Sequence, residues 1–167
     1  MDALVIAAGT PYAVAVYDVR RSGRWSQTSG RRGATPPASL WWHHTCGPAV
    51  VTTPEKQVFA LLREARVAEY GLPYNFVVYP DDPASVYYLN DVDLCWPHTY
   101  AHNCDVAIAA EGNYETHEPP AQMVSKMKAL ADALATMWQV YLPTYGHRDC
   151  YPTACPGQYL YPLLAGY

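Results

Sequence analysis

Hydrophobic positions recur with helical spacing in two long segments. In residues 52–71, Thr53 and Pro54 favour a helix start and Gly71 favours its end. The apolar stripe of this segment comprises Val58, Leu61, Leu62 and Ala65. In residues 119–141 the positions in phase are Val124, Met127, Leu130, Ala131, Leu134, Trp138 and Tyr141. The pattern predicts two amphipathic helices with one face each against a core.

Between these segments the pattern changes to short apolar or alternating runs, which is typical of strands. The chain start up to residue 19 is apolar, is interrupted by Gly9-Thr10-Pro11, and then alternates, which indicates an N-terminal hairpin. Further runs that predict strands are 38–45, 74–79, 85–90 and 105–110. Strands and helices therefore alternate, and we expect the α/β class, with a mixed central β-sheet flanked by α-helices.

The length of 167 residues suits one domain over residues 1–167. Within it we expect an N-terminal hairpin and surface loop over residues 1–37 and a core over residues 38–160. Residues 19–37 are rich in Arg, Ser and Gly and have no periodicity, so they predict a long surface connection. Its five arginines favour a solvated loop over a contact with a polyanion.

Composition and charge exclude several partners. Half of the residues are apolar and 16% are charged, as in an ordinary globular protein. The formal net charge of -4 argues against a nucleic-acid binder and against an anionic membrane surface as the main partner. No apolar run has the 18 residues that a membrane span requires, and the start of the chain lacks the basic region of a signal peptide. We therefore expect no membrane insertion and synthesis in the cytoplasm without a recognisable signal peptide.

Histidines and cysteines carry the candidate chemistry. His43 and His44 end a predicted strand, so they point to opposite faces and only one of them can face a given site. His147 and Cys155 lie in the turn-rich stretch GHRDCYPTACPG. That stretch is open to two interpretations, a disulfide-stapled loop or part of a metal site that a strand-end histidine completes. A zinc hydrolase needs three such ligands and one open position.

Four blocks occur in order along the chain: LWWHHTCG, LPYNFVVY, HTYAHNCDVAIAAEGNY and GHRDCYPTACPG. They resemble the motifs of the type 2 N-acetylmuramoyl-L-alanine amidases, a family that includes the peptidoglycan recognition proteins and many phage endolysins. The resemblance covers roughly residues 38 to 160. It implies a zinc site in a surface groove and hydrolysis of the amide bond between N-acetylmuramic acid and L-alanine in bacterial peptidoglycan.

The resemblance also implies residue roles. It makes His43, His147 and Cys155 the ligands of one Zn²⁺ ion, with His43 preferred over His44. Tyr74 and Thr153 match catalytic positions, although Tyr74 also fits an interior aromatic and Thr153 a turn residue bonding its own backbone. We expect a monomeric endolysin of phage or prophage that acts on the cell wall. The alternative is a peptidoglycan-binding module without turnover.

Some positions depart from the family or remain open. Certain relatives carry a glutamate on the strand that here reads AIAAEG, where Glu111 follows two alanines, and the sequence does not show whether Glu111 faces the site. With Cys155 assigned to metal, the remaining cysteines could form two bridges in any of three pairings or stay reduced: Cys46, Cys95, Cys104 and Cys150. For His98, His102 and Asn103 we expect structural hydrogen bonding, with contact to glycan or peptide as the less favoured alternative.

Overall fold

The computed structural model describes residues 2–27, 30–48 and 52–167. The elements run in the order β1 (Asp2–Ile6), β2 (Val14–Asp18), β3 (Leu40–His44), α1 (Pro54–Val67), β4 (Phe76–Val78), β5 (Val86–Tyr88), β6 (Val106–Ala110), α2 (Ala121–Trp138), β7 (Thr144–Gly146), a 3-10 turn (His147–Asp149) and α3 (Tyr161–Leu164). Strands and helices alternate through the central part of the chain, as the hydrophobic pattern predicts.

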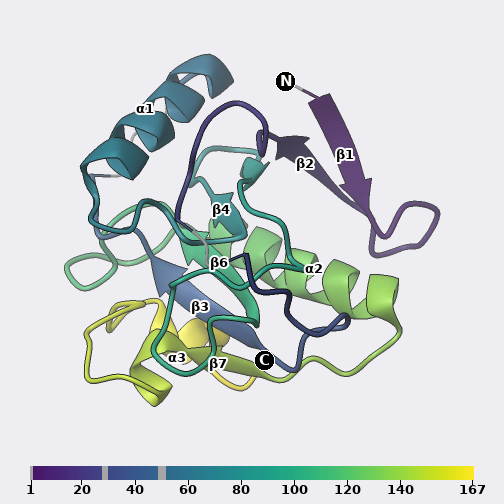
Figure 1. The fold of residues 1–167 in the computed structure, drawn as a ribbon. Coiled ribbons are helices and arrows are strands. Elements are labelled where there is room, and N and C mark those ends of the chain that lie inside the picture. The colour runs from purple at the N-terminus through teal and green to yellow at the C-terminus, as the bar shows by residue number, and fades with distance from the viewer. Residues whose placement is uncertain (1, 28–29, 49–51) are drawn as a thin grey trace.

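All seven strands form one sheet in the order β1-β2-β5-β4-β6-β3-β7 (Figure 1). The pairs β1–β2 and β4–β5 are antiparallel, whereas β2–β5, β4–β6, β3–β6 and β3–β7 are parallel. The predicted mixed sheet and the N-terminal hairpin are thus confirmed. The sheet centre holds β4, β6 and β3, whose residues are all buried, because both faces are covered.

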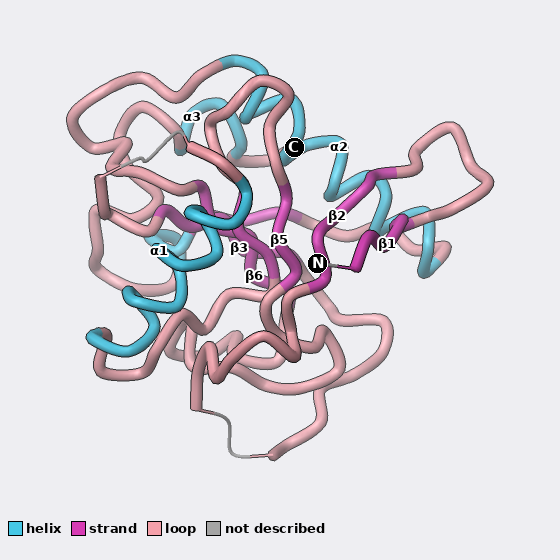
Figure 2. The backbone as a smooth tube through the Cα atoms, turned by 90° about the horizontal axis from the view of Figure 1, so that it is seen from above, coloured by secondary structure: helices cyan, strands magenta, loops and turns pink. Residues whose placement is uncertain are grey.

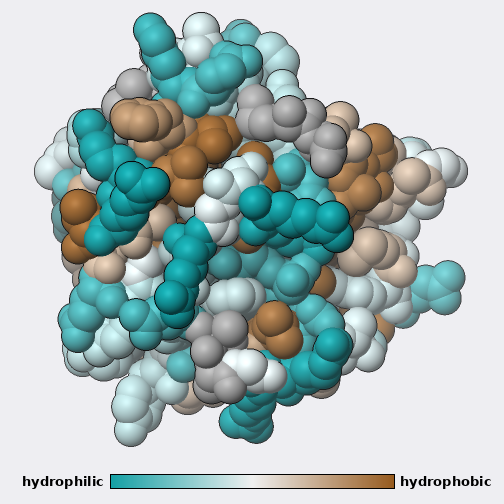
Figure 3. Space-filling model, turned by 45° about the horizontal axis from the view of Figure 1, so that its top comes forward, coloured by the Kyte–Doolittle hydropathy of each residue, from teal (hydrophilic) through white to brown (hydrophobic). Residues whose placement is uncertain are grey.

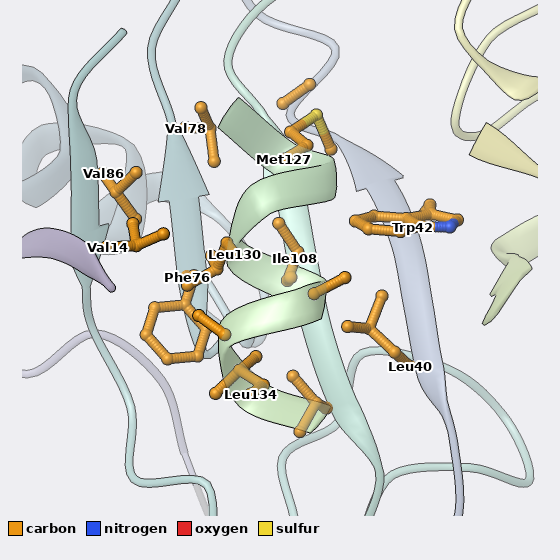
Figure 4. Close-up of a cluster of buried hydrophobic side chains, with 14 of the residues drawn as sticks. Val14, Leu40, Trp42, Phe76, Val78, Val86, Ile108, Met127, Leu130 and Leu134 are labelled. Carbon is orange, nitrogen blue, oxygen red and sulfur yellow. The ribbon is translucent and has the colours of Figure 1, made fainter. Parts of the chain in front are cut away.

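The two long helices lie on opposite faces of the sheet, as the view in Figure 2 shows. On the α2 face, side chains from β3, β4, β5 and β6 pack against Met127, Leu130 and Leu134 (Figure 4). On the α1 face, Val77 and Ala109 pack against Leu61 and Ala65. Alternation along each central strand therefore divides the core into two layers.

The helix ends differ from the prediction. α1 ends at Val67, and Gly71 instead adopts a φ of 77° and forms an isolated bridge to Ser26. Thr53 occupies the N-cap position of α1 without a side-chain hydrogen bond. The assignment of Tyr141 to the inner face of the second helix is wrong, because α2 ends at Trp138 and the Tyr141 side chain is 84% exposed. Gln139, with a left-handed φ of 57°, stops α2 and turns the chain away.

The connection after β2 is a surface loop whose first part lies against α1, while residues 28 and 29 fall outside the described part. Trp25 is 2% exposed in the α1-side core, and its carbonyl accepts a hydrogen bond from Leu72 N at 2.6 Å.

None of the helices within the described ranges has the length and apolarity that a membrane crossing requires. A disulfide joins Cys95 to Cys104, which decides one of the pairings left open.

Candidate metal centre

Parallel pairing of β3 with β7 brings two histidines together. Leu40, Trp41 and Trp42 pair in register with Thr144, Tyr145 and Gly146. The residue that follows each of these paired segments is a histidine, so His43 of β3 and His147 at the end of β7 lie side by side at the same end of the sheet. Their ring centroids are 4.8 Å apart. The stretch GHRDCYPTACPG is thus more regular than expected, because Gly146 ends a strand and His147 begins a 3-10 turn.

The loop after His147 folds back and delivers Cys155 to the same place. Arg148 N donates to Cys155 O at 3.1 Å, and the Arg148 guanidinium also contacts the Ala154 carbonyl. Asp149 accepts from Gly146 N at 2.7 Å and from the Tyr161 hydroxyl at 2.6 Å. These bonds hold the loop in a closed shape without a disulfide.

His43, His147 and Cys155 form a cluster that could hold a metal ion. Each offers one ligand atom, and these atoms all lie within 4.8 Å of one another. The Cys155 Sγ is 3.7 Å from His43 Nδ1. Two imidazoles and a thiol at such separations suit a tetrahedral ion with its fourth position open. Of the two interpretations of the loop, the geometry favours the metal site, because Cys155 is not in a disulfide.

His98 fixes the orientation of the His43 ring. His98 Nε2 lies 3.2 Å from the carbonyl of Asp105, which can only accept, so Nε2 carries the proton and Nδ1 accepts. The His43 Nε2 at 3.2 Å is then the donor to His98 Nδ1. The lone pair of His43 Nδ1 is thereby directed at the cluster, a support typical of metal ligands. We expected structural hydrogen bonding for His98, but the sequence did not show that its partner is a candidate ligand.

Burial sets the protonation of the cluster. It lowers the pKa of His43 well below its usual value, with the neighbouring His98 and His147 adding to the effect, and it lowers the pKa of His147 as well. Burial also lowers the pKa of His98 to about 3. The imidazoles are therefore neutral at pH 7, the form that binds metals. Burial raises the pKa of the Cys155 thiol to about 12, so a nearby cation is needed for the thiolate to form.

Tyr74 lies beside this cluster. Its ring centroid is 5.1 Å from that of His43, and its hydroxyl is 3.5 Å from the carbonyl of His44. Burial raises the pKa of Tyr74, with Cys155 and Glu111 adding smaller effects, so the hydroxyl keeps its proton. Tyr74 therefore lies next to the candidate ligands, and its catalytic role stays a prediction.

Thr153 is in the same loop, two residues before Cys155. Its Oγ1 accepts a hydrogen bond from Cys155 N at 3.2 Å. This is the turn contact that was one of its two interpretations. The hydroxyl proton of Thr153 is not used in that bond, so the contact fixes the oxygen and leaves the donor free for another acceptor.

Glu111 lies at the end of β6, with a side chain only 1% exposed. An added Cβ on Gly47 would lie 3.7 Å from Glu64 Oε1 and 4.0 Å from Glu111 Oε1, so both carboxyl groups lie close to Gly47. Burial and the neighbouring Glu64 raise the pKa of Glu111 to about 8. Among the described residues its Oε2 has no hydrogen-bond partner. No local pattern indicates this proximity, because Glu64 lies on α1, far from Glu111 along the chain.

The remaining histidines and cysteines point elsewhere. His44 turns to the opposite face, where its Nδ1 accepts from Tyr114 N at 3.2 Å. The Cys150 thiol is 2.7 Å from the Thr99 hydroxyl, and Cys46 is exposed with a left-handed φ of 62°. His102 stacks on Trp41, with 4.3 Å between centroids. The alternation argument for the histidine pair is therefore confirmed.

A family model described as N-acetylmuramoyl-L-alanine amidase matches residues 33–158. The match covers most of the chain and contains every residue of the cluster. The chain belongs to this amidase family. The expected resemblance is thus confirmed, and the family comprises peptidoglycan amidases together with relatives that bind peptidoglycan without hydrolysis. Among curated protein sequences no relative is detected.

Solved structures of amidase-like proteins share the fold. Drosophila PGRP-LB has a TM-score of 0.75 at 21% identity, covering 88% of this chain and 90% of that chain. Drosophila peptidoglycan recognition protein SD reaches 0.76 at 19% identity, with 89% and 92% covered. The N-acetylmuramoyl-L-alanine amidase LysC from Clostridium intestinale gives 0.65 at 22% identity, with 88% and 91% covered. The single-domain, peptidoglycan recognition protein-like fold that we expected is therefore present.

Proposed function

We propose that this chain is a zinc-dependent amidase that cleaves the bond between N-acetylmuramic acid and L-alanine in bacterial peptidoglycan. The observation that carries the proposal is the cluster of His43, His147 and Cys155 with Tyr74 beside it. A protein that only binds peptidoglycan needs no such cluster of ligands. Family membership supports the substrate class.

The residues fit a zinc ion by their chemistry. Two neutral imidazoles and one thiol are ligand types that zinc accepts, and three protein ligands leave a position open for catalysis. Burial raises the pKa of the Cys155 thiol to about 12, so the thiolate that would bind zinc forms only when the cation itself is present. When bound, zinc polarises the scissile carbonyl and makes a water nucleophile available at neutral pH.

The chain's own residues orient the His43 ring and donate hydrogen bonds to the substrate carbonyl. His98 holds the His43 ring so that Nδ1 faces the cluster. The Tyr74 hydroxyl, which keeps its proton, donates a hydrogen bond to the carbonyl oxygen as negative charge develops on it. The Thr153 hydroxyl, fixed by Cys155 N, serves as a second donor from the other loop. The breaking bond leaves a free amino group on L-alanine, which takes up a proton.

The reaction is tested with purified peptidoglycan and the full chain. We expect the turbidity of a wall suspension to fall and new amino termini of L-alanine to appear, with both effects abolished by a chelator and restored by Zn²⁺. Mass spectrometry of the fragments identifies the bond. Binding to the walls without new amino termini would overturn the amidase and favour the binding module.

A matched pair of cysteine variants tests the ligand assignment. Cys155→Ala should lose both bound zinc and turnover, whereas Cys150→Ala should keep both, because the Cys150 thiol contacts the Thr99 hydroxyl and the His147 backbone carbonyl but none of the candidate ligand atoms. Equal zinc content and activity in the two variants would contradict the assignment.

The biological setting is part of the same proposal. The chain is a monomeric phage or prophage endolysin, made in the cytoplasm of its host and acting on the cell wall. Size-exclusion chromatography with light scattering tests the monomer, and lysis of bacteria by the added protein tests the endolysin role. A stable dimer would contradict the monomer. Failure to lyse bacteria whose purified walls the protein cleaves would contradict the endolysin role.

A further inference from the structure

The outward side of α1 carries apolar and cationic residues together. Phe59 and Val67 are 68% and 81% exposed, and Tyr70 just beyond the helix is 53% exposed. Lys56, Arg63 and Arg66 are exposed on the same helix. Positions 56, 59, 63, 66 and 67 lie within an arc of about 100° of an α-helix, so they form one stripe. We call this stripe, with Tyr70, the α1 outer face.

The loop after β2 adds charge next to this face. A Cβ on Gly23 would lie 2.3 Å from the Leu62 side chain, so the loop rests directly on α1. The exposed Arg21 and Arg24 flank that contact. Arg24 and Arg66 line one hollow of about 230 Å³, which Glu69 also borders. Residues far apart in sequence therefore present positive charge at one place.

Charge is strongly segregated along the chain. Residues 19–72 contain eight of the 11 basic and three of the 15 acidic residues, so they carry +5, and the rest of the chain carries -9. The overall charge of -4 is the sum of these two parts and does not reveal the positive segment. Within the described residues, no ion pair up to 4.0 Å involves the five cations at positions 21, 24, 56, 63 and 66. Their charge is available to a partner.

We propose that the α1 outer face binds the surface of an anionic lipid bilayer. Figure 3 shows hydrophobic and strongly hydrophilic side chains interleaved on the side of the molecule where α1 lies. A polyanion in solution would be bound by the cations alone and would leave the apolar side chains in water. Transfer of exposed Phe59 and Val67 from water to the boundary of headgroups and acyl chains is favourable. Cations beside them complement anionic headgroups. The combination favours a lipid surface over a dissolved polymer.

The candidate metal centre lies on another side of α1. Around the helix axis Glu64 lies about 60° beyond Val67 and thus outside the stripe. Its carboxylate lies near Gly47, and it is one of the charges that raise the pKa of Tyr74 beside the cluster. A bilayer on the outer face would leave the cluster accessible. The inference does not depend on hydrolysis, since lipid binding is measured separately.

Co-sedimentation of the full chain with vesicles tests the proposal. We expect binding to vesicles of equal parts phosphatidylglycerol and phosphatidylcholine, weak binding to pure phosphatidylcholine, and loss of binding as salt rises. Arg63→Gln and Arg66→Gln should each weaken the affinity roughly fivefold, the effect of one cation near an anionic surface. Phe59→Ser should weaken it roughly tenfold.

Two matched controls lie outside the α1 outer face. Lys126→Gln removes a charge on α2, and Tyr141→Ser removes an aromatic side chain that is 84% exposed. Both should bind vesicles like the parent protein. All variants should retain the parent activity on lipid-free peptidoglycan and the parent circular dichroism spectrum, which separates lost lipid binding from a folding defect.

Several outcomes would overturn the proposal. One is no binding to anionic vesicles, and another is equal weakening by the controls and the α1 variants. A third is tight binding to soluble polyphosphate that Phe59→Ser leaves unchanged, which would assign the face to a polyanion. A dimer that Phe59→Ser dissociates would assign it to a second copy of this chain.

Discussion

Replacing Glu111 with glutamine should change how the stability of the protein depends on pH. Glu111 is 1% exposed, lies near Glu64, and has a pKa raised from 4.5 to about 8 by burial and by that neighbour. The unfolded chain releases this proton near pH 4.5, whereas the folded chain keeps it until about pH 8. Between these values the folded state binds more protons, so rising pH lowers the free energy of unfolding.

The magnitude follows from the same shift. One pH unit within this window is worth about 1.4 kcal/mol for one proton, so the loss between pH 4.5 and 7 is at most about 3 kcal/mol. Sharing of the proton with Glu64 reduces it, and we expect about 1 to 3 kcal/mol. Glu111→Gln removes the titration and should flatten the profile. The buried imidazoles give the opposite slope in both proteins, so the difference between the two profiles isolates Glu111.

Urea unfolding at several values between pH 5 and 7.5 measures the effect. A chelator is present throughout, so that no bound ion alters the charges near the site. Because the new amide also lacks a partner at the Oε2 position, the variant will differ by a constant offset, and the slope is the informative quantity. The exposed Glu118→Gln serves as control. Parallel profiles for Glu111→Gln and the parent protein would refute the reasoning.

Three further predictions concern the site and its supports. Tyr74→Phe should lower kcat on peptidoglycan by about 10²- to 10³-fold while zinc content stays unchanged, and an unaltered kcat would remove Tyr74 from the mechanism. Replacing Cys95 and Cys104 by serine should lower the free energy of unfolding in urea by about 2.5 kcal/mol, an effect that a reductant should mimic in the parent protein but not in the variant. Gly157→Ala should cost on the order of 2 kcal/mol in the same assay, because Gly157 has a φ of 103° and a Cβ would lie 2.3 Å from the Tyr114 carbonyl carbon; a stability equal to the parent's would contradict that strain.

The sequence predicts most of the elements and the fold class, because each central strand and each long helix has a one-sided or fully apolar pattern. It does not predict the ends of the helices. Gly71 is a strong stop signal, yet α1 stops four residues earlier, where the chain must turn to pair with Ser26. Tyr141 has the helical spacing of the apolar stripe, but Gln139 ends α2 before this residue.

The site was predictable only in part. The motif resemblance brought His43, His147 and Cys155 together, but the physical reason is the register of β3 with β7, which no local pattern encodes. The support of His43 by His98 and the proximity of Glu111 to Glu64 depend on tertiary packing, and so does the pairing of Cys95 with Cys104. These contacts join segments whose local sequences carry no mutual signal.

The wide separation of the cluster in sequence has a consequence for translation. His43 and Cys155 are 112 residues apart in the chain. At ribosomal rates of 5 to 20 residues per second, His43 is made roughly 6 to 22 seconds before Cys155. The full ligand set cannot exist in that interval, and the β3–β7 pairing cannot form until β7 has been made near the end of the interval. A nascent chain is therefore inert towards its proposed substrate, and the order of synthesis itself delays the appearance of the metal centre.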